Sequence, residues 1–80
     1  METLLHDILS KIVDHPDSIS LTREEDDFTI RINLTAHEDD YPKIIGKNGS
    51  TIKALTEILR LYDIKMNKDS QKKIFINAAS

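Results

Sequence analysis

Two glycines that could hold a phosphate group lie in a short basic stretch, and they are the only glycines in the chain. The stretch contains three lysines and no acidic residue, and it runs Lys43-Ile44-Ile45-Gly46-Lys47-Asn48-Gly49-Ser50-Thr51-Ile52-Lys53-Ala54-Leu55. Because glycine has no Cβ, a sugar-phosphate backbone can come close to the main chain at both positions. Lys47, between them, adds a mobile positive charge. These residue types and this spacing predict an anion site.

A helix is expected directly after this stretch. Apolar residues recur at helical spacing from Ile52 and Leu55 through Leu59 to Tyr62, which predicts a helix over residues 50–64. The first N–H groups of a helix have no intrahelical partner, and they lie at the positive end of the helix dipole. The loop that precedes this helix is therefore a natural place for a phosphate.

The same two glycines allow three other interpretations. Asn48-Gly49 is a strong hairpin signal, but the flanking residues do not alternate as strands would. A nucleotide P-loop would need glycine at Tyr41 and a serine or threonine at Asn48, so that interpretation fails. A helix-turn-helix corner, with Gly49 as a simple turn residue, is not excluded by the glycine spacing alone.

The stretch resembles the signature of KH domains, in which I-I-G-x-x-G precedes a helix that begins I-x-x-L/I. KH modules use this loop to clamp the backbone of about four single-stranded nucleotides. The whole chain looks like the small bacterial KH proteins of the KhpA type. It departs from them at Pro42, where glycine is common, and at Ser50, where a basic residue is frequent.

The resemblance implies an RNA-binding surface and the part that each residue plays in it. The four loop residues would hold phosphates, three isoleucines would form an apolar floor under bases, and the flanking lysines would add contacts. Each isoleucine could equally be a core residue, and each flanking lysine could be merely solvated. The implied surface comprises Lys43, Ile44, Ile45, Gly46, Lys47, Asn48, Gly49, Ser50, Ile52 and Lys53.

The same resemblance implies a role. Proteins of this type are described as RNA-binding or RNA-chaperone proteins that act with a second KH protein of the KhpB/Jag type, with links to cell division and envelope homeostasis. The expected function is single-stranded RNA binding in RNA chaperoning or post-transcriptional regulation. The alternative is a protein-interaction module that keeps a KH scaffold and binds little RNA, because fold alone does not fix function.

Composition bounds the remaining possibilities. Eighty residues predict one domain, residues 1–80. The net charge is −3, but residues 1–40 carry −8 and residues 41–80 carry +5, so the second half can attract phosphates. Cysteine is absent, which suits a reducing cytoplasm. The N-terminus has an early acid and no long apolar run, so neither a signal peptide nor a membrane span is expected.

The hydrophobic pattern predicts an α+β fold. Apolar pairs at every fourth residue predict a first helix that closes at His15-Pro16. Residues 18–23 and 28–35 alternate as strands, with Phe28, Ile30, Ile32 and Leu34 inward, around a polar turn at residues 24–27. A short second helix starts at about Glu38 or later, with Pro42 in its first turn, and ends at Gly46. Residues 72–78 form a last strand. The order α-β-β-α-α-β is that of the type II KH fold: three strands with three helices on one face.

Catalysis and metal binding are not expected from the sequence. His6, His15 and His37 lie at separate polar positions, and each is interpreted as a solvated surface residue. No cofactor fingerprint or cluster of metal ligands is apparent, and the run Glu24-Glu25-Asp26-Asp27 lacks the spacing of a calcium loop. Neither a cofactor nor a metal is predicted.

The third helix carries more apolar residues than one sheet can cover. Ile52, Leu55, Leu59 and Tyr62 form one stripe that should face the sheet. A second stripe predicts a homodimer interface, which a KH partner could also occupy. The alternative is that Ile58 completes the core and Leu61 is a tolerated exposed leucine. The second stripe consists of Ala54, Ile58, Leu61 and the aliphatic stem of Lys65.

Overall fold

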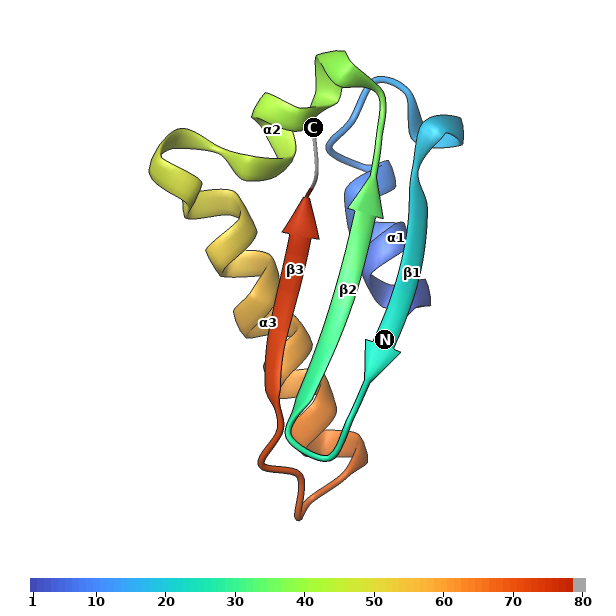
Figure 1. The fold of residues 1–80 in the computed structure, drawn as a ribbon. Coiled ribbons are helices and arrows are strands. Elements are labelled where there is room, and N and C mark those ends of the chain that lie inside the picture. Colours follow the sequence, from blue (N-terminus) through green and yellow to red (C-terminus); the bar gives the residue numbers. More distant parts are fainter. Residues whose placement is uncertain (79–80) are drawn as a thin grey trace.

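A three-stranded sheet carries three helices on one of its faces (Figure 1), in a computed structural model that describes residues 1–78. The predicted order α-β-β-α-α-β and the α+β class are confirmed. Short 3-10 turns, at Pro16–Ser18, Glu38–Asp40 and Lys47–Gly49, join some of the elements. The helices and strands are α1 (Glu2–Ser10), β1 (Ser20–Glu25), β2 (Thr29–Thr35), α2 (Tyr41–Ile45), α3 (Ser50–Met66) and β3 (Lys73–Ala78).

Strand β2 lies at the centre of the sheet. It pairs antiparallel with β1, where Leu21 faces Leu34, and parallel with β3, where Ile30 faces Ile74. A parallel pair requires a long crossover, and α2 and α3 form that crossover between β2 and β3. The loop between these two helices is therefore placed at one end of the sheet (Figure 1).

The core lies between the sheet and the helices. The inward residues of β2 are Ile30, Ile32 and Leu34, and all three are buried as their alternation predicts. Helix α1 contributes residues one turn apart, and α3 contributes the centre of its first stripe, since these positions share a helix face. The residues that the helices and β3 contribute to this core are Leu5, Leu9, Ile44, Leu55, Leu59 and Ile74.

Helix α1 is shorter than predicted. It ends at Ser10 instead of continuing to His15-Pro16. The apolar pattern does continue, because Val13 is buried, but Ile12 is 37% exposed. The chain leaves the helix because the side chain of Asp40 accepts hydrogen bonds from the backbone N–H groups of Asp14 and His15. Those N–H groups would otherwise bond to carbonyls one turn earlier in a continued helix.

Phe28 was predicted to point inward, and this is wrong, because the side chain is 79% exposed. One carboxylate oxygen of Asp26 accepts hydrogen bonds from the backbone N–H groups of both Phe28 and Thr29, each 2.7 Å long. This bonding makes Phe28 a turn residue and starts β2 one residue later than predicted. Strand β1 also extends to Glu25, so two of the four turn acids belong to a strand.

Within residues 1–78, no helix is both long enough and apolar enough to cross a membrane.

Candidate nucleic-acid interface

Helices α2 and α3 meet at the four-residue glycine loop, Gly46-Lys47-Asn48-Gly49. Helix α2 stops at Gly46, whose N–H donates to the carbonyl of Pro42 (2.9 Å). Pro42 lies in the first turn of α2, as predicted, where its missing N–H has no helical partner to lose. The φ and ψ of Gly46 are 75° and 174°, a conformation that is essentially restricted to glycine. The chain therefore turns sharply at this residue.

Gly46 also lies against the first turn of α3. A Cβ added to it would be 2.8 Å from the backbone nitrogen of Thr51, and it would collide with the Oγ1 of the same residue. A Cβ at Gly49 would meet only the Cγ2 of Ile52, at 3.9 Å. The first glycine is thus needed for close packing of the backbone, whereas the second leaves its surroundings open.

The second half of the loop is left-handed. Asn48 has a φ of 56° and Gly49 a φ of 75°, and asparagine is among the few side chains that tolerate this region. The N–H of Gly49 donates to the carbonyl of Gly46 (3.2 Å), which closes the turn. The side chains of Lys47 and Asn48 are both exposed, so they are accessible to a ligand.

The positive end of α3 lies at this loop. Gly49 occupies the capping position, and within the described residues no side chain accepts a hydrogen bond from the first N–H groups of the helix. Helix α3 has 17 residues, which is long enough to develop a full dipole. Its first turn therefore offers N–H donors and partial positive charge to an anion at the loop.

The three lysines of the basic stretch differ in their surroundings. Lys47 and Lys53 are exposed, and within residues 1–78 neither forms an ion pair. Lys43 instead donates a hydrogen bond to the carboxylate of Asp14, across from the end of α1. This bond, with burial opposing it, raises the pKa of Lys43, so the lysine stays charged but shares its charge with a carboxylate. Two lysines remain as unshared positive charges beside the loop.

The three isoleucines of the expected apolar floor also differ. Ile44 is fully buried in the core, so its side chain presents no surface to a ligand. Ile45 and Ile52 are partly exposed on either side of the glycine loop. Ser50 is exposed at the start of α3. The accessible surface is thus the predicted one without Ile44.

Helix α3 presents both of its predicted stripes. Leu55 and Leu59 are buried against the sheet, with Ile52 and Tyr62 partly buried beside them. In the second stripe, Ile58 is 41% exposed and Leu61 is 67% exposed, with Ala54 and Lys65 also exposed. Ile58 therefore does not complete the core, and an apolar strip remains uncovered along the helix.

Two histidines that are far apart in the sequence come together in space. His15 and His37 are stacked, with ring centroids 3.9 Å apart, and both lie close to the carboxylate of Asp39. His15 follows α1, whereas His37 and Asp39 precede α2, so no local spacing signals the group. Only the packing of the two connections, fixed by Asp40, brings the residues together.

A mixed three-stranded sheet with helices on one face, and a G-x-x-G loop joining two of those helices, together define a KH domain. The comparison with known families agrees, since residues 2–76 match the family described as KhpA/KhpB, KH domain. The chain belongs to this family.

Curated relatives cover most of the chain. The chain is 39% identical to the RNA-binding protein KhpA of Bacillus subtilis, over 94% of this chain and 93% of that protein. It is 34% identical to the RNA-binding protein KhpA of Oceanobacillus iheyensis, over 96% of this chain and 97% of that protein. The same protein of Halalkalibacterium halodurans is 41% identical over 74% of this chain and 78% of its own length. No solved structure matches the chain.

Proposed function

We propose that this protein binds single-stranded RNA in the cytoplasm and holds the RNA backbone with the loop Gly46-Lys47-Asn48-Gly49. The observation that carries the proposal is the geometry of this loop. Its close glycine turn, its exposed Lys47 and Asn48 and the uncapped end of α3 all lie at one place. The relatives, named as RNA-binding proteins, support the choice of RNA as the anion.

The phosphates would lie against the first turn of α3, where backbone N–H groups and the helix dipole attract them. Lys47 and Lys53 supply positive charge, and Ile45 and Ile52 supply partly exposed apolar surface for unstacked bases. The loop and its flanks, residues 43–60, contain no aromatic side chain on which a base could stack. Sequence selectivity is therefore expected to be low.

Binding should depend on salt in a defined way. If Lys47 and Lys53 each contact one phosphate, the slope of log affinity against log salt is about −1.4, from about −0.7 per contact on single strands. Fluorescence anisotropy with a labelled single-stranded oligonucleotide measures this slope, and the matching duplex is the control. Equal affinity for the duplex, or an affinity that does not change with salt, would contradict the proposal, since duplex bases cannot enter such a site.

We further propose a finer role, in RNA chaperoning or post-transcriptional regulation with links to cell division and envelope homeostasis, as the resemblance to KhpA-type proteins implies. We also propose that the protein forms a heteromer with a KH protein of the KhpB/Jag type. Its test is co-purification of the two proteins, in which exchange of the second-stripe leucine, Leu61, for lysine should abolish the complex.

A second candidate is a protein-interaction module that binds little RNA, and one observation favours it. The second stripe of α3 leaves Ile58 41% and Leu61 67% exposed, in a domain whose other α3 leucines are buried. We propose that this strip, Ala54, Ile58, Leu61 and Lys65, forms a homodimer by pairing with its copy around a two-fold axis. The two candidates are compatible, and RNA titration separates an RNA-binding dimer from a module without RNA affinity.

A further inference from the structure

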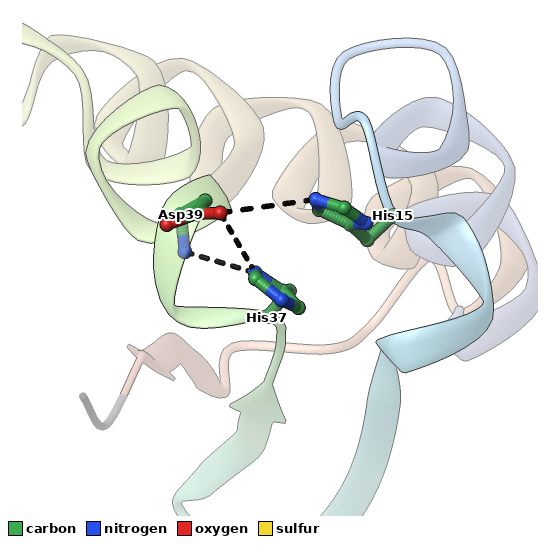
Figure 2. A group of neighbouring side chains, drawn as sticks. All are labelled: His15, His37 and Asp39. Atoms are coloured by element: carbon green, nitrogen blue, oxygen red, sulfur yellow. Dashed lines mark hydrogen bonds and ion pairs between the residues drawn. The ribbon is translucent and has the colours of Figure 1, made fainter.

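Two histidines and an aspartate form a compact group where the chain after α1 meets the chain before α2 (Figure 2). Each residue offers one ligand atom, and these atoms lie within 4.8 Å of one another. The Nδ1 of His37 is 3.5 Å from the Oδ2 of Asp39, and the Nε2 of His15 is 4.0 Å from the same oxygen. One carboxylate oxygen therefore faces a nitrogen of each ring.

The backbone under this group is held in place. The buried carboxylate of Asp40 accepts the N–H of His15 at 2.9 Å and the N–H of Asp14 at 3.1 Å. Asp40 directly follows Asp39, so these two bonds clamp the segment that carries His15 onto the turn that carries the aspartate. The three side chains thus come from two chain segments that are fixed relative to each other before any ligand binds.

One of the nitrogen lone pairs is already oriented. The N–H of Asp39 donates to the Nδ1 of His37 at 3.1 Å, so this nitrogen must be unprotonated. The lone pair consequently points toward the aspartate and not into open solvent. A metal ion at this position would replace the N–H group as its partner.

We propose that His15, His37 and Asp39 form a binding site for a divalent transition metal, Zn²⁺ by preference. Imidazole nitrogen and carboxylate oxygen are common ligands of Zn²⁺, and three protein ligands leave the fourth position to water. Two ligand atoms about 2.1 Å from a tetrahedral ion lie roughly 3.4 Å apart. The nitrogen-to-oxygen distances of 3.5 and 4.0 Å are close to that separation before any adjustment.

One adjustment is required. The rings are stacked with an angle of 25° between their planes, whereas a metal lies close to the plane of each imidazole that binds it. The rings must therefore open from the stack by rotation of their side chains. The His15 side chain is 44% exposed and the His37 side chain is 36% exposed, so this rotation moves no core residue.

The bound ion would link the segment after α1 to the turn that leads into α2, the helix that ends in the glycine loop. Since the three ligands converge only when these two segments are packed, the ion binds the folded chain and not the unfolded one. The melting temperature should then rise with Zn²⁺ concentration. This inference is independent of RNA binding.

The experiment is calorimetric titration of ZnCl₂ into the untagged full chain, after treatment with a chelator and in a buffer that does not bind zinc. The expected result is one Zn²⁺ bound per chain, with His15→Asn and His37→Asn each weakening binding by about tenfold or more. Both variants should stay folded by circular dichroism, because Asp40 bonds to the backbone of His15 and not to its ring. Asp39→Asn serves as a further ligand variant if either histidine variant unfolds.

The matched control is His6→Asn, which removes a histidine that lies on α1 outside the group and should leave zinc affinity unchanged. A second measurement follows the imidazole nitrogen chemical shifts by NMR, which should move for His15 and His37 but not for His6. The proposal is overturned if Zn²⁺ does not saturate one site. It is also overturned if the two ligand variants keep wild-type affinity, or if His6→Asn weakens binding as much as they do.

Discussion

Gly46 packs directly against Thr51, across the turn that separates the end of α2 from the start of α3. A Cβ on Gly46 would be 2.8 Å from both the backbone nitrogen and the Cβ of Thr51. The neighbouring atom is main chain, which cannot rotate away as a flexible side chain could. The loop is therefore built around a close approach that only glycine permits, and its φ of 75° and ψ of 174° add a second reason.

We predict that Gly46→Ala is clearly more destabilising than Gly49→Ala. Backbone strain at Gly46 costs about 1–3 kcal/mol of unfolding free energy, and displacement of Thr51 adds to this. Gly49→Ala costs about 1–2 kcal/mol, because its left-handed conformation is strained but the added Cβ has open space. Urea unfolding of both variants measures the difference. Equal losses of unfolding free energy in the two variants would mean that the contact with Thr51 adds nothing to the cost at Gly46.

A charge reversal in the loop should abolish RNA binding without unfolding the chain. In the double variant Lys47→Asp/Asn48→Asp, two carboxylates replace exposed side chains and repel the phosphates. Aspartate tolerates the left-handed φ of 56° at position 48 much as asparagine does, so the melting temperature should barely change. Anisotropy with single-stranded RNA and circular dichroism measure the two effects.

The matched control for that variant is Lys68→Asp/Gln71→Glu, which changes the net charge by the same amount at exposed positions beyond the far end of α3. It should lower RNA affinity only slightly, through the overall charge. Wild-type RNA affinity in the loop variant, or an equal loss in the control, would argue against the glycine loop as the binding site.

Local patterns predicted most of the fold, and they failed where a distant side chain decided the outcome. The alternation of β2 and the spacing of α3 predicted which of their residues are buried, since each pattern reflects one covered face. The end of α1 depends on Asp40, which is far away in the sequence. Phe28 is apolar and continues the alternation of β2, but the Asp26 carboxylate places it in a turn. The pattern of hydrophobic residues does not reveal the hydrogen bonds of either Asp40 or Asp26.

The candidate sites show the same division. The glycine loop is contiguous in the sequence, so its residue types alone indicated its place and its chemistry. The pairing of Lys43 with Asp14 and the group of His15, His37 and Asp39 each join a segment before β1 to a segment after β2. Such meetings depend on how the connections pack, and one sequence without its fold does not reveal them.

The ionised carboxyl group of Asp40 should make the stability of the fold depend on pH in the acidic range. Burial opposes ionisation of its carboxyl group, but the N–H groups of Asp14 and His15 outweigh burial and hold the pKa below its usual value. A folded-state pKa below the unfolded value of about 3.9 stabilises the fold above that pH, and the contribution is lost as pH falls through the folded pKa. Stability of the wild type should thus decline below about pH 4.

The variant Asp40→Asn tests this origin. Its amide can accept one of the two backbone hydrogen bonds, while its NH₂ group faces the other N–H donor, so the variant should melt at lower temperature at pH 7. It should also lose part of the decline in acid, because the titrating group is gone. Thermal melts across pH measure both effects. The control is Asp17→Asn, which removes an exposed carboxylate in the 3-10 turn that follows His15. An unchanged pH profile in Asp40→Asn would assign the acid sensitivity to other carboxylates.

Release of Lys43 from its ion pair should strengthen RNA binding. In Asp14→Asn the hydrogen-bonding carboxylate of Lys43 is removed, which lowers the pKa of the lysine toward its normal value but leaves it charged. One more phosphate contact would steepen the salt slope from about −1.4 to about −2. Titrations at several salt concentrations measure the change, with Asp7→Asn on α1 as the control for lost negative charge. An unchanged slope would exclude Lys43 from the RNA-binding surface.

Leu61→Lys should turn a dimer into a folded monomer. Leu61 is 67% exposed at the centre of the second stripe of α3, so a lysine there is well solvated in the monomer but would be buried between two copies of the helix. Sedimentation should show the change in mass with little change in melting behaviour. Binding to long RNA should weaken, because two linked clamps raise the effective concentration of the second, whereas binding to a four-nucleotide ligand should stay the same. Met66→Lys places the same charge on another side of α3, at a residue that is 61% exposed and lies outside the second stripe, and should leave the dimer intact. A wild-type protein that is monomeric at high micromolar concentration would refute the homodimer.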